Sequence, residues 1–195
     1  PHVIDVDEAL KPDAPLLHDD IFTTGVTPKP EKPSNTVQRV QMQLGDPDAA
    51  FKDADVVVER SFKTKTVHQG YIEPHAVVAE WSEDGQCRIW CSSQGHFMVR
   101  TLTARLLNME VAQVRVMPME IGGGFGGKTI IFIEPTAVLL ARKAERPVRI
   151  VMSRDEVLRG TGPAPGTSID VKIGAKKDGT LVAAFATDSG DIPLW

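Results

Sequence analysis

The chain has 195 residues, of which 42% are hydrophobic and 25% are charged, and its formal net charge is -4. A chain of this length can bury one sizeable core, and its apolar runs fall well short of the ~20 residues that a membrane-spanning helix needs, so we expect a soluble protein without a membrane span. The lysines and arginines are scattered and form no basic stripe, so nucleic acid is not an expected partner.

The first part of the chain is rich in proline. Six of the 14 prolines fall within the first 33 residues, which predicts an extended, proline-rich connector over residues 1–35, leading from a preceding domain. Domain structure is expected over residues 36–195, beginning with a strand at 36–45, where apolar and polar residues alternate. Asp46 and Pro47 then provide an N-cap and a first helical position for a short helix.

The rest of the chain mixes strand-like and helix-like periodicity. Asp84-Gly85 and Asp178-Gly179 are typical hairpin turns. The elements that we expect are a strand at 56–69, a hairpin at 76–93, a helix at 96–108, a strand at 112–119, a helix at 135–144, a strand at 146–153, a short helix at 154–159 and a hairpin at 167–189. The predicted fold class is therefore α+β, with mixed sheets that combine antiparallel hairpins with helical crossovers.

Both cysteines lie in one predicted strand. Cys87 and Cys91 would be separated by ~13 Å along a straight strand, which is too far for a disulfide. Two free thiols favour a reducing compartment, so we expect a cytoplasmic protein.

The most unusual stretch is MEIGGGFGGKT at residues 119–129, where five of the six residues 122–127 are glycine. A glycine loop between a strand and a helix exposes backbone N–H groups, which bind anions or negatively charged oxygens. The loop satisfies a dinucleotide-binding pattern through Gly122, Gly124 and Gly127, and also the Walker pattern over residues 122–129. A non-enzymatic nucleotide-binding module that uses Gly122–Gly127 is therefore one hypothesis, although the surrounding hairpins are unlike the repeated βαβ units of those folds.

A second hypothesis comes from five ordered blocks: HQGYIEPHAVVAEW, IWCSSQGHFMVRTLTARLL, VRVMPMEIGGGFGGK, EPTAVLLARKAERPVRIVMSRDE and DGTLVAA. In order and spacing they resemble the molybdenum-containing large subunit of the xanthine oxidase family, which includes xanthine dehydrogenases, aldehyde oxidoreductases and carbon monoxide dehydrogenases. The resemblance runs from about residue 45 to about residue 184. It implies that the chain is a fragment containing the N-terminal part of a molybdopterin-binding domain.

The resemblance also implies a set of site residues. It places Gln94, Gly123, Gly124, Phe125 and Gly126 at the cofactor. Gln94 and Phe125 would lie near the molybdenum through its oxo ligand, without binding the metal directly. The catalytic glutamate of the family is expected beyond Trp195, so the isolated chain is expected to be inactive.

The implied cofactor is a molybdenum-molybdopterin, with the cytosine dinucleotide form as one alternative. The implied reaction is hydroxylation of an aldehyde, an N-heterocycle or a similar electron-poor carbon, using oxygen derived from water. The implied partners are the remainder of the large subunit, a small-molecule substrate, and subunits or domains that carry 2Fe-2S clusters and FAD.

Several other polar residues have simpler interpretations. His68 and His75 match no usual metal-ligand spacing and are expected to be structural. Glu73 and Glu134 each precede a proline and are expected to stabilise a turn or a helix rather than catalyse. Thr129 stands where several purine-oxidising members carry a substrate-binding glutamate, so a purine substrate is not assigned.

Overall fold

The structure is a computed structural model that describes residue 3 and residues 5–190. The chain forms two compact units. Unit 1 combines residues 1–66 with residues 165–195, and unit 2 comprises residues 67–164. No helix in the described part of the chain combines the length and the apolar character required to cross a membrane.

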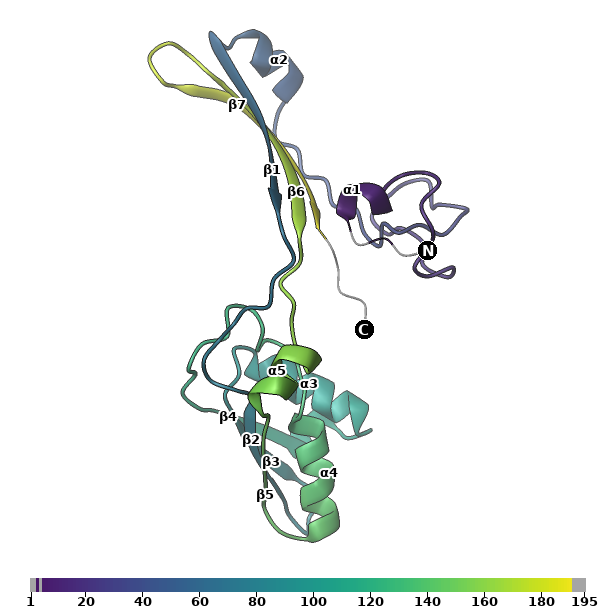
Figure 1. The fold of residues 1–195 in the computed structure, drawn as a ribbon, viewed down its shortest axis with the longest axis vertical. Coiled ribbons are helices and arrows are strands. Elements are labelled where there is room, and N and C mark those ends of the chain that lie inside the picture. The colour runs from purple at the N-terminus through teal and green to yellow at the C-terminus, as the bar shows by residue number, and fades with distance from the viewer. Residues whose placement is uncertain (1–2, 4, 191–195) are drawn as a thin grey trace. The chain divides into compact units, whose positions relative to one another are not determined.

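Unit 1 contains a three-stranded antiparallel sheet in the order β1-β6-β7, formed by β1 (Val56–Thr64), β6 (Thr167–Ala175) and β7 (Leu181–Gly190) (Figure 1). Two short helices accompany it, α1 (Val6–Ala9) and α2 (Pro47–Lys52). The predicted cap of α2 is confirmed, because the Asp46 side chain accepts a hydrogen bond from the Ala49 N–H at 3.0 Å. The predicted C-terminal hairpin is likewise formed by β6 and β7.

The predicted strand at 36–45 is wrong. Apart from one isolated bridge between Gln38 and Thr24, these residues have no strand structure. The alternation is present, but its apolar side chains point to solvent: Val40, Met42 and Leu44 are 71%, 92% and 98% exposed. An alternating pattern becomes a strand only when a partner strand and a buried face are available.

Unit 2 contains a mixed four-stranded sheet in the order β4-β3-β2-β5. Its strands are β2 (Ala76–Trp81), β3 (Cys87–Cys91), β4 (Val114–Pro118) and β5 (Val148–Val151). β2 pairs antiparallel with both β3 and β5, whereas β3 and β4 are parallel. The fold class α+β, with hairpins and helical crossovers, is confirmed.

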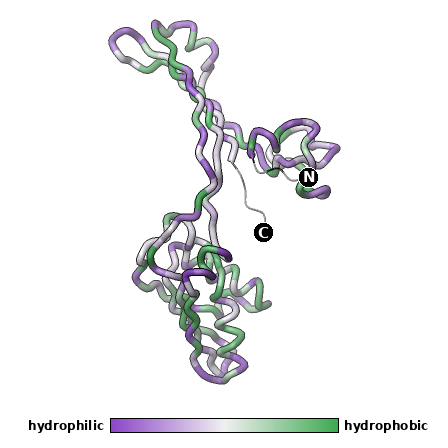
Figure 2. Tube along the Cα trace, viewed as in Figure 1, coloured by the Kyte–Doolittle hydropathy of each residue, from purple (hydrophilic) through white to green (hydrophobic). Residues whose placement is uncertain are grey.

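The helices of unit 2 are α3 (His96–Leu106), the 3-10 turn η1 (Val111–Gln113), α4 (Glu134–Ala144) and α5 (Arg154–Gly160). α3 and η1 connect β3 to β4, α4 connects β4 to β5, and α5 follows β5. α3 packs on β4, and α4 packs on β2 and β5 (Figure 1). Hydrophobic segments recur along these strands and helices (Figure 2).

The core of unit 2 lies between the sheet and the helices α3 and α4. Along β3 the buried residues are Cys87, Ile89 and Cys91, in the period-two pattern of a strand with one covered face. Helix residues such as Val99 and Val138 complete this core and are fully buried. The opposite face of the hairpin carries the exposed Arg88–Glu80 ion pair. The two cysteines are free thiols, as predicted.

Candidate functional site

The glycine loop and the segment that contains Gln94 leave the sheet of unit 2 at the same edge. β3 and β4 are parallel neighbours, so the segment Ser92–Gly95 after β3 and the loop after β4 both begin at the carboxyl ends of their strands. Carboxyl ends of adjacent parallel strands are a common location for binding sites. The sheet topology therefore brings together the two segments that the sequence analysis placed at one site.

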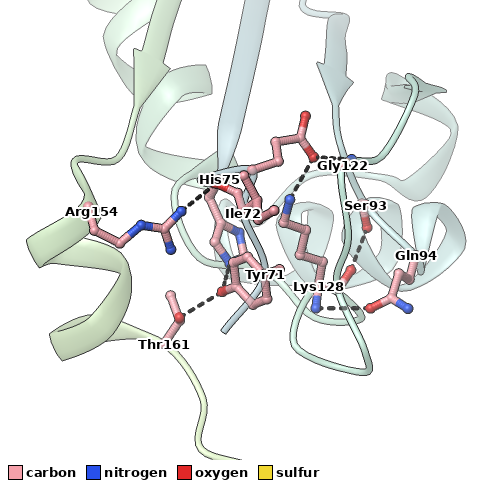
Figure 3. Close-up of polar contacts among 10 residues, drawn as sticks. Tyr71, Ile72, His75, Ser93, Gln94, Gly122, Lys128, Arg154 and Thr161 are labelled. Carbon is pink, nitrogen blue, oxygen red and sulfur yellow. Dashed lines mark hydrogen bonds and ion pairs between the residues drawn. The ribbon is translucent and has the colours of Figure 1, made fainter. Parts of the chain in front are cut away.

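Gln94 is hydrogen-bonded to the loop at both its backbone and its side chain. Its Oε1 accepts hydrogen bonds from the N–H groups of Gly126 at 3.0 Å and Lys128 at 3.2 Å, and its own N–H donates to the Lys128 carbonyl at 2.8 Å. Figure 3 shows the Gln94 side chain against this part of the loop. Because both neighbours of Oε1 are donors, the Nε2 group is left to donate, and it has no partner among the described residues.

Ser93 strengthens the same junction. Its hydroxyl donates to the Lys128 carbonyl at 3.0 Å and accepts from the Gly95 N–H at 3.0 Å. The Ser93 side chain is buried, so these bonds are shielded from water. The end of the loop at Lys128 is consequently fixed to the start of α3.

Phe125 has an unusual conformation. Its φ is +52°, a left-handed value that few aromatic residues adopt, and its side chain is 74% exposed. Within the described residues, its backbone N–H has no hydrogen-bond acceptor. A strained and exposed aromatic residue at the tip of a loop is a feature that suggests function rather than stability.

At three positions of the loop, neighbouring side chains of the same protein explain why the residue is glycine. A Cβ at Gly122 would lie 2.6 Å from the Cβ of Glu73, one at Gly124 would lie 2.5 Å from the Gln94 Oε1, and one at Gly127 would lie 2.8 Å from the Tyr71 Cε1. Real Cβ atoms essentially never lie this close to another atom, so internal packing excludes a side chain at Gly122 and Gly127, and a side chain at Gly124 would displace Gln94.

Two of the glycines have left-handed φ values. Gly123 has a φ of +97° and also packs on Tyr71, which lies 3.2 Å from the position of a Cβ. Gly126 has a φ of +88°, and nothing lies within 4 Å of the position of a Cβ. Gly126 is therefore where the loop faces open space.

An ion pair that the sequence analysis did not predict lies beneath the loop. The Lys128 Nζ is 2.7 Å from the Glu73 Oε2, and the same oxygen accepts a hydrogen bond from the Gly122 N–H at 2.7 Å. The Lys128 side chain is 1% exposed, and its ammonium lies 4.9 Å from the centre of the Tyr71 ring. Burial by itself would raise the pKa of Glu73, but the hydrogen bonds from Lys128 and Gly122 outweigh it, so the pKa is lowered.

A second network, formed by His68, Tyr71, His75 and Thr161, holds the segment under the loop. Figure 3 shows the Tyr71 side chain between His75 and Thr161. The Thr161 hydroxyl donates to the Val157 carbonyl at 2.7 Å and therefore accepts from the Tyr71 hydroxyl at 2.8 Å. The proton of Tyr71 is then used, so the His75 Nε2, 2.7 Å away, must be the donor to the Tyr71 oxygen. The donor and the acceptor of each hydrogen bond from His75 through Tyr71 and Thr161 to Val157 are thus assigned.

The remaining contacts of the network fit the structural role expected for the two histidines. The His68 Nδ1 accepts from the Gly70 N–H at 3.0 Å, so its Nε2 carries the proton and donates to Thr161 at 3.1 Å. Burial, followed by the charge of Lys128, lowers the pKa of His75 to about 4. His75 therefore stays neutral near pH 7.

The geometry does not favour the nucleotide-binding hypothesis. In a Walker loop the lysine reaches bound phosphates, whereas the Lys128 ammonium is buried against Glu73. Residues 128–133 separate the loop from α4, so the loop does not open directly into a helix. β4 is also an edge strand of a mixed sheet, unlike the parallel sheet of either nucleotide-binding fold.

Comparisons with known proteins agree on one family. Residues 28–191 match the family described as "Molybdopterin cofactor-binding domain". The nicotinate dehydrogenase large molybdopterin subunit of Eubacterium barkeri is 31% identical over 189 residues, which cover 97% of this chain and 41% of that protein. The xanthine dehydrogenase of Emericella nidulans is 32% identical over 145 residues, covering 73% of this chain and 11% of that protein.

Solved structures give the same result. The CO dehydrogenase of Oligotropha carboxidovorans superposes with a TM-score of 0.71 at 28% identity, covering 96% of this chain and 24% of that one. The aldehyde oxidoreductase of Desulfovibrio gigas superposes with a TM-score of 0.69 at 25% identity, covering 95% and 19%. The chain thus spans less than half the length of each of these four proteins.

Proposed function

The chain belongs to the family of molybdopterin cofactor-binding domains, and from this premise we propose that Gln94 and the loop Gly123–Gly126 hold one side of a molybdenum-pterin cofactor. The complete enzyme would be an oxidoreductase that hydroxylates an electron-poor carbon with oxygen derived from water. The residues in contact with the cofactor would be Gln94, Gly123, Gly124, Phe125 and Gly126.

The observation that carries this proposal is a pair of hydrogen-bond donors without partners in the described chain. One is the Gln94 Nε2, which is left over once Oε1 has accepted from Gly126 and Lys128. The other is the Phe125 N–H, presented by a left-handed backbone. Two neutral donors beside open space at Gly126 suit a metal-bound oxygen, because they stabilise negative charge and are held in place before it binds.

The donor set fits the cofactor chemically, and it also divides the roles within the loop. Gln94 and Phe125 would be the donors near the molybdenum, whereas the Gly126 N–H is already used by Gln94. Gly126 would instead provide clearance, since a side chain there would project into the open space. The bound cofactor supplies the redox-active metal that takes electrons from the substrate.

The carboxylates of Glu73 and Glu134 suit structural support rather than catalysis. Glu73 is committed to Lys128 and Gly122, and Glu134 is buried, with its Oε2 accepting from the Phe132 N–H at 2.8 Å. A general base must be within reach of the proton that it removes. We therefore propose that the catalytic glutamate comes from another part of the large subunit and that this chain alone does not turn over substrate.

The loop gives a limited indication of substrate class. Thr129 is uncharged, and its hydroxyl donates to the Gly126 carbonyl at 3.0 Å. No carboxylate is therefore presented at this position to a basic heterocycle. The proposed substrates are therefore aldehydes and N-heterocycles, and a purine substrate is not proposed.

The complete enzyme would also need a route for electrons. We propose partner subunits or domains that carry 2Fe-2S clusters and FAD, together with the remainder of the large subunit. The free, buried thiols of Cys87 and Cys91 are compatible with a reducing, cytoplasmic location.

The test is to purify the complete enzyme that contains this chain and to measure its molybdenum and its released pterin. We expect about one molybdenum per large subunit, a pterin that can be analysed for the cytosine dinucleotide, and hydroxylated product that carries ¹⁸O from labelled water. Absence of molybdenum, together with saturable binding of ATP or NADP that is lost in Gly124→Ala, would instead establish the nucleotide-binding alternative.

A further inference from the structure

The ion pair beneath the glycine loop joins the two ends of that loop. Gly122 opens the loop and Lys128 closes it, and the Glu73 Oε2 lies 2.7 Å from both the Gly122 nitrogen and the Lys128 Nζ. The Glu73 N–H also donates to the Gly122 carbonyl at 3.2 Å. One residue from the segment before β2 thus contacts the loop through three hydrogen bonds.

Lys128 links this contact to the candidate site. Its side chain contacts Glu73, while its backbone N–H and carbonyl contact the Gln94 side chain and backbone. A displacement of the ammonium therefore moves the same residue that fixes the direction of the Gln94 amide. The Phe125 N–H lies on the loop between the two fixed ends.

The burial of Lys128 makes a purely stabilising role a poor explanation. An ammonium that is 1% exposed loses its hydration, and an apolar pair of the same size commonly gives equal or greater stability. What an apolar pair cannot do is accept the Gly122 N–H and orient it. The Glu73–Lys128 ion pair is therefore better explained by its effect on the conformation of the loop than by a contribution to stability.

We propose that Glu73 and Lys128 are positioning residues that set the conformation of the glycine loop, and thereby the direction in which the Gln94 amide and the Phe125 N–H point. The inference rests on the proposed function only for the identity of the group that is bound. The conformation of the loop can be measured without that group.

The two test variants are Lys128→Met, which keeps an unbranched side chain of nearly the same length but removes its charge, and Glu73→Gln. Lys128→Met is the milder change, because the Glu73 side chain is 31% exposed and water can solvate its carboxylate. Glu80→Gln is the matched control, since it removes the carboxylate of the exposed Glu80–Arg88 pair in the same unit. All variants are made in the complete enzyme.

The first readout is amide hydrogen exchange in enzyme produced without molybdate. We expect exchange at Gly126 and Lys128 to become faster by roughly tenfold or more in both test variants, the loss associated with one charge-assisted hydrogen bond. Neither of these amides contacts Glu73, so faster exchange there reports the loop conformation. Amides of the β2–β3 hairpin and every amide of Glu80→Gln should keep wild-type exchange.

The second readout is molybdenum content after production with molybdate, which should fall severalfold in both test variants and stay unchanged in Glu80→Gln. Wild-type exchange at Gly126 and Lys128 in the test variants would overturn the inference. If the wild-type enzyme produced with molybdate contained no molybdenum, the proposed function would be overturned but the positioning role would not. The hydrogen-exchange result is obtained without molybdate and does not depend on the cofactor.

A charge reversal separates positioning from simple ion pairing. In Glu73→Lys combined with Lys128→Glu the opposite charges remain, but the Gly122 N–H faces an ammonium and loses its acceptor. We expect the reversed pair to show the same fast exchange as the single variants. Recovery of wild-type exchange in the reversed pair would show that any ion pair suffices and would contradict the positioning role.

Discussion

The Gln94 Oε1 accepts the Gly126 N–H at 3.0 Å, across 32 positions of the sequence, and so determines which end of the Gln94 amide faces outward. An acceptor at this position organises the loop, and the Nε2 donor is what remains for a bound group. These two roles of one side chain can be separated by substitution.

Gln94→Glu should keep the loop and lose the donor. A glutamate accepts from Gly126 and Lys128 as Gln94 does, but an ionised carboxylate has no N–H to give. We expect the thermal midpoint to stay near that of the wild type, and the molybdenum content or turnover to fall about 10- to 100-fold, as for other groups that orient a metal site. Gln94→Ala, which removes both roles, should also lower the thermal midpoint. A fully active Gln94→Glu enzyme would exclude the donor role.

Gly124→Ala should destabilise unit 2 by about 1–3 kcal/mol, because the added methyl group would displace the Gln94 side chain and break the two hydrogen bonds that its Oε1 accepts. The added Cβ would lie 2.5 Å from the Gln94 Oε1. Gly160→Ala in α5 is the matched control, since the nearest atom to its Cβ is the Met152 Cε at an ordinary 3.8 Å. Denaturant unfolding of both variants is the measurement. Equal stabilities would show that Gly124 is not required for packing against Gln94.

Phe125→Asn should leave stability almost unchanged. The side chain is 74% exposed, so little burial is lost, and asparagine tolerates the left-handed φ of +52° better than phenylalanine does. We expect a change in the free energy of unfolding within about 0.5 kcal/mol. The variant also keeps the backbone N–H that the proposed site uses, so turnover of the complete enzyme should stay near that of the wild type. A large loss of turnover would assign the function of Phe125 to its ring instead of its N–H.

Stability should decrease as the pH falls from 6.5. The pKa of His75 is lowered from 6.5 to about 4 in the folded protein, chiefly by burial and then by the charge of Lys128, while the charge of Glu73 opposes the shift. The unfolded chain then binds more protons than the folded chain in this range, so the free energy of unfolding rises with pH between about 4 and 6.5. The contribution amounts to roughly 2–3 kcal/mol.

A substitution can test whether His75 causes this pH dependence of stability. Glu73 has a lowered pKa, so its own contribution is lost only as the pH falls below its ordinary value of 4.5. Burial raises the pKa of Glu134, which gives a slope of the opposite sign above pH 4.5, so the slope of His75 is the part that substitution removes. In His75→Gln the amide nitrogen replaces the Nε2 donor to Tyr71 and does not titrate. We expect a smaller rise of stability with pH between 4.5 and 6.5 than in the wild type, measured by urea unfolding at several pH values. An unchanged slope would assign the pH dependence to other groups.

Both cysteines should be unreactive in the folded protein. Burial raises the pKa of Cys87 to about 11, and burial with the nearby Glu134 charge raises the pKa of Cys91 to about 12. The thiolate is the reactive species, so alkylation at pH 8 should be very slow. Mass spectrometry should show both thiols modified after denaturation and neither before. Fast native labelling would mean that the core of unit 2 opens readily.

Local sequence features were sufficient for several elements of the fold. The Asp84-Gly85 turn and the period-two pattern of the flanking residues define the β2–β3 hairpin, because turn geometry and strand burial are short-range properties. The cap at Asp46 similarly acts within one helical turn. The five ordered blocks identified the family, and Gln94 was placed at the site only through them.

The tertiary structure decided which alternating segments pair with another strand. Residues 36–45 alternate as a strand would, yet no strand within the described part of the chain covers Val40, Met42 and Leu44. Alternation specifies which side chains share a face, but burial of that face depends on distant segments.

The reason for the glycines was also decided at this level. The sequence showed that side chains are excluded from the loop and suggested that a ligand excludes them. The structure shows that Glu73 and Tyr71 exclude them at Gly122 and Gly127, and that a side chain at Gly124 would displace Gln94. The Glu73–Lys128 ion pair was missed because its partners lie 55 positions apart in the sequence. Only folding brings the buried Lys128 ammonium to the Glu73 carboxylate, which also accepts the Gly122 N–H of the loop.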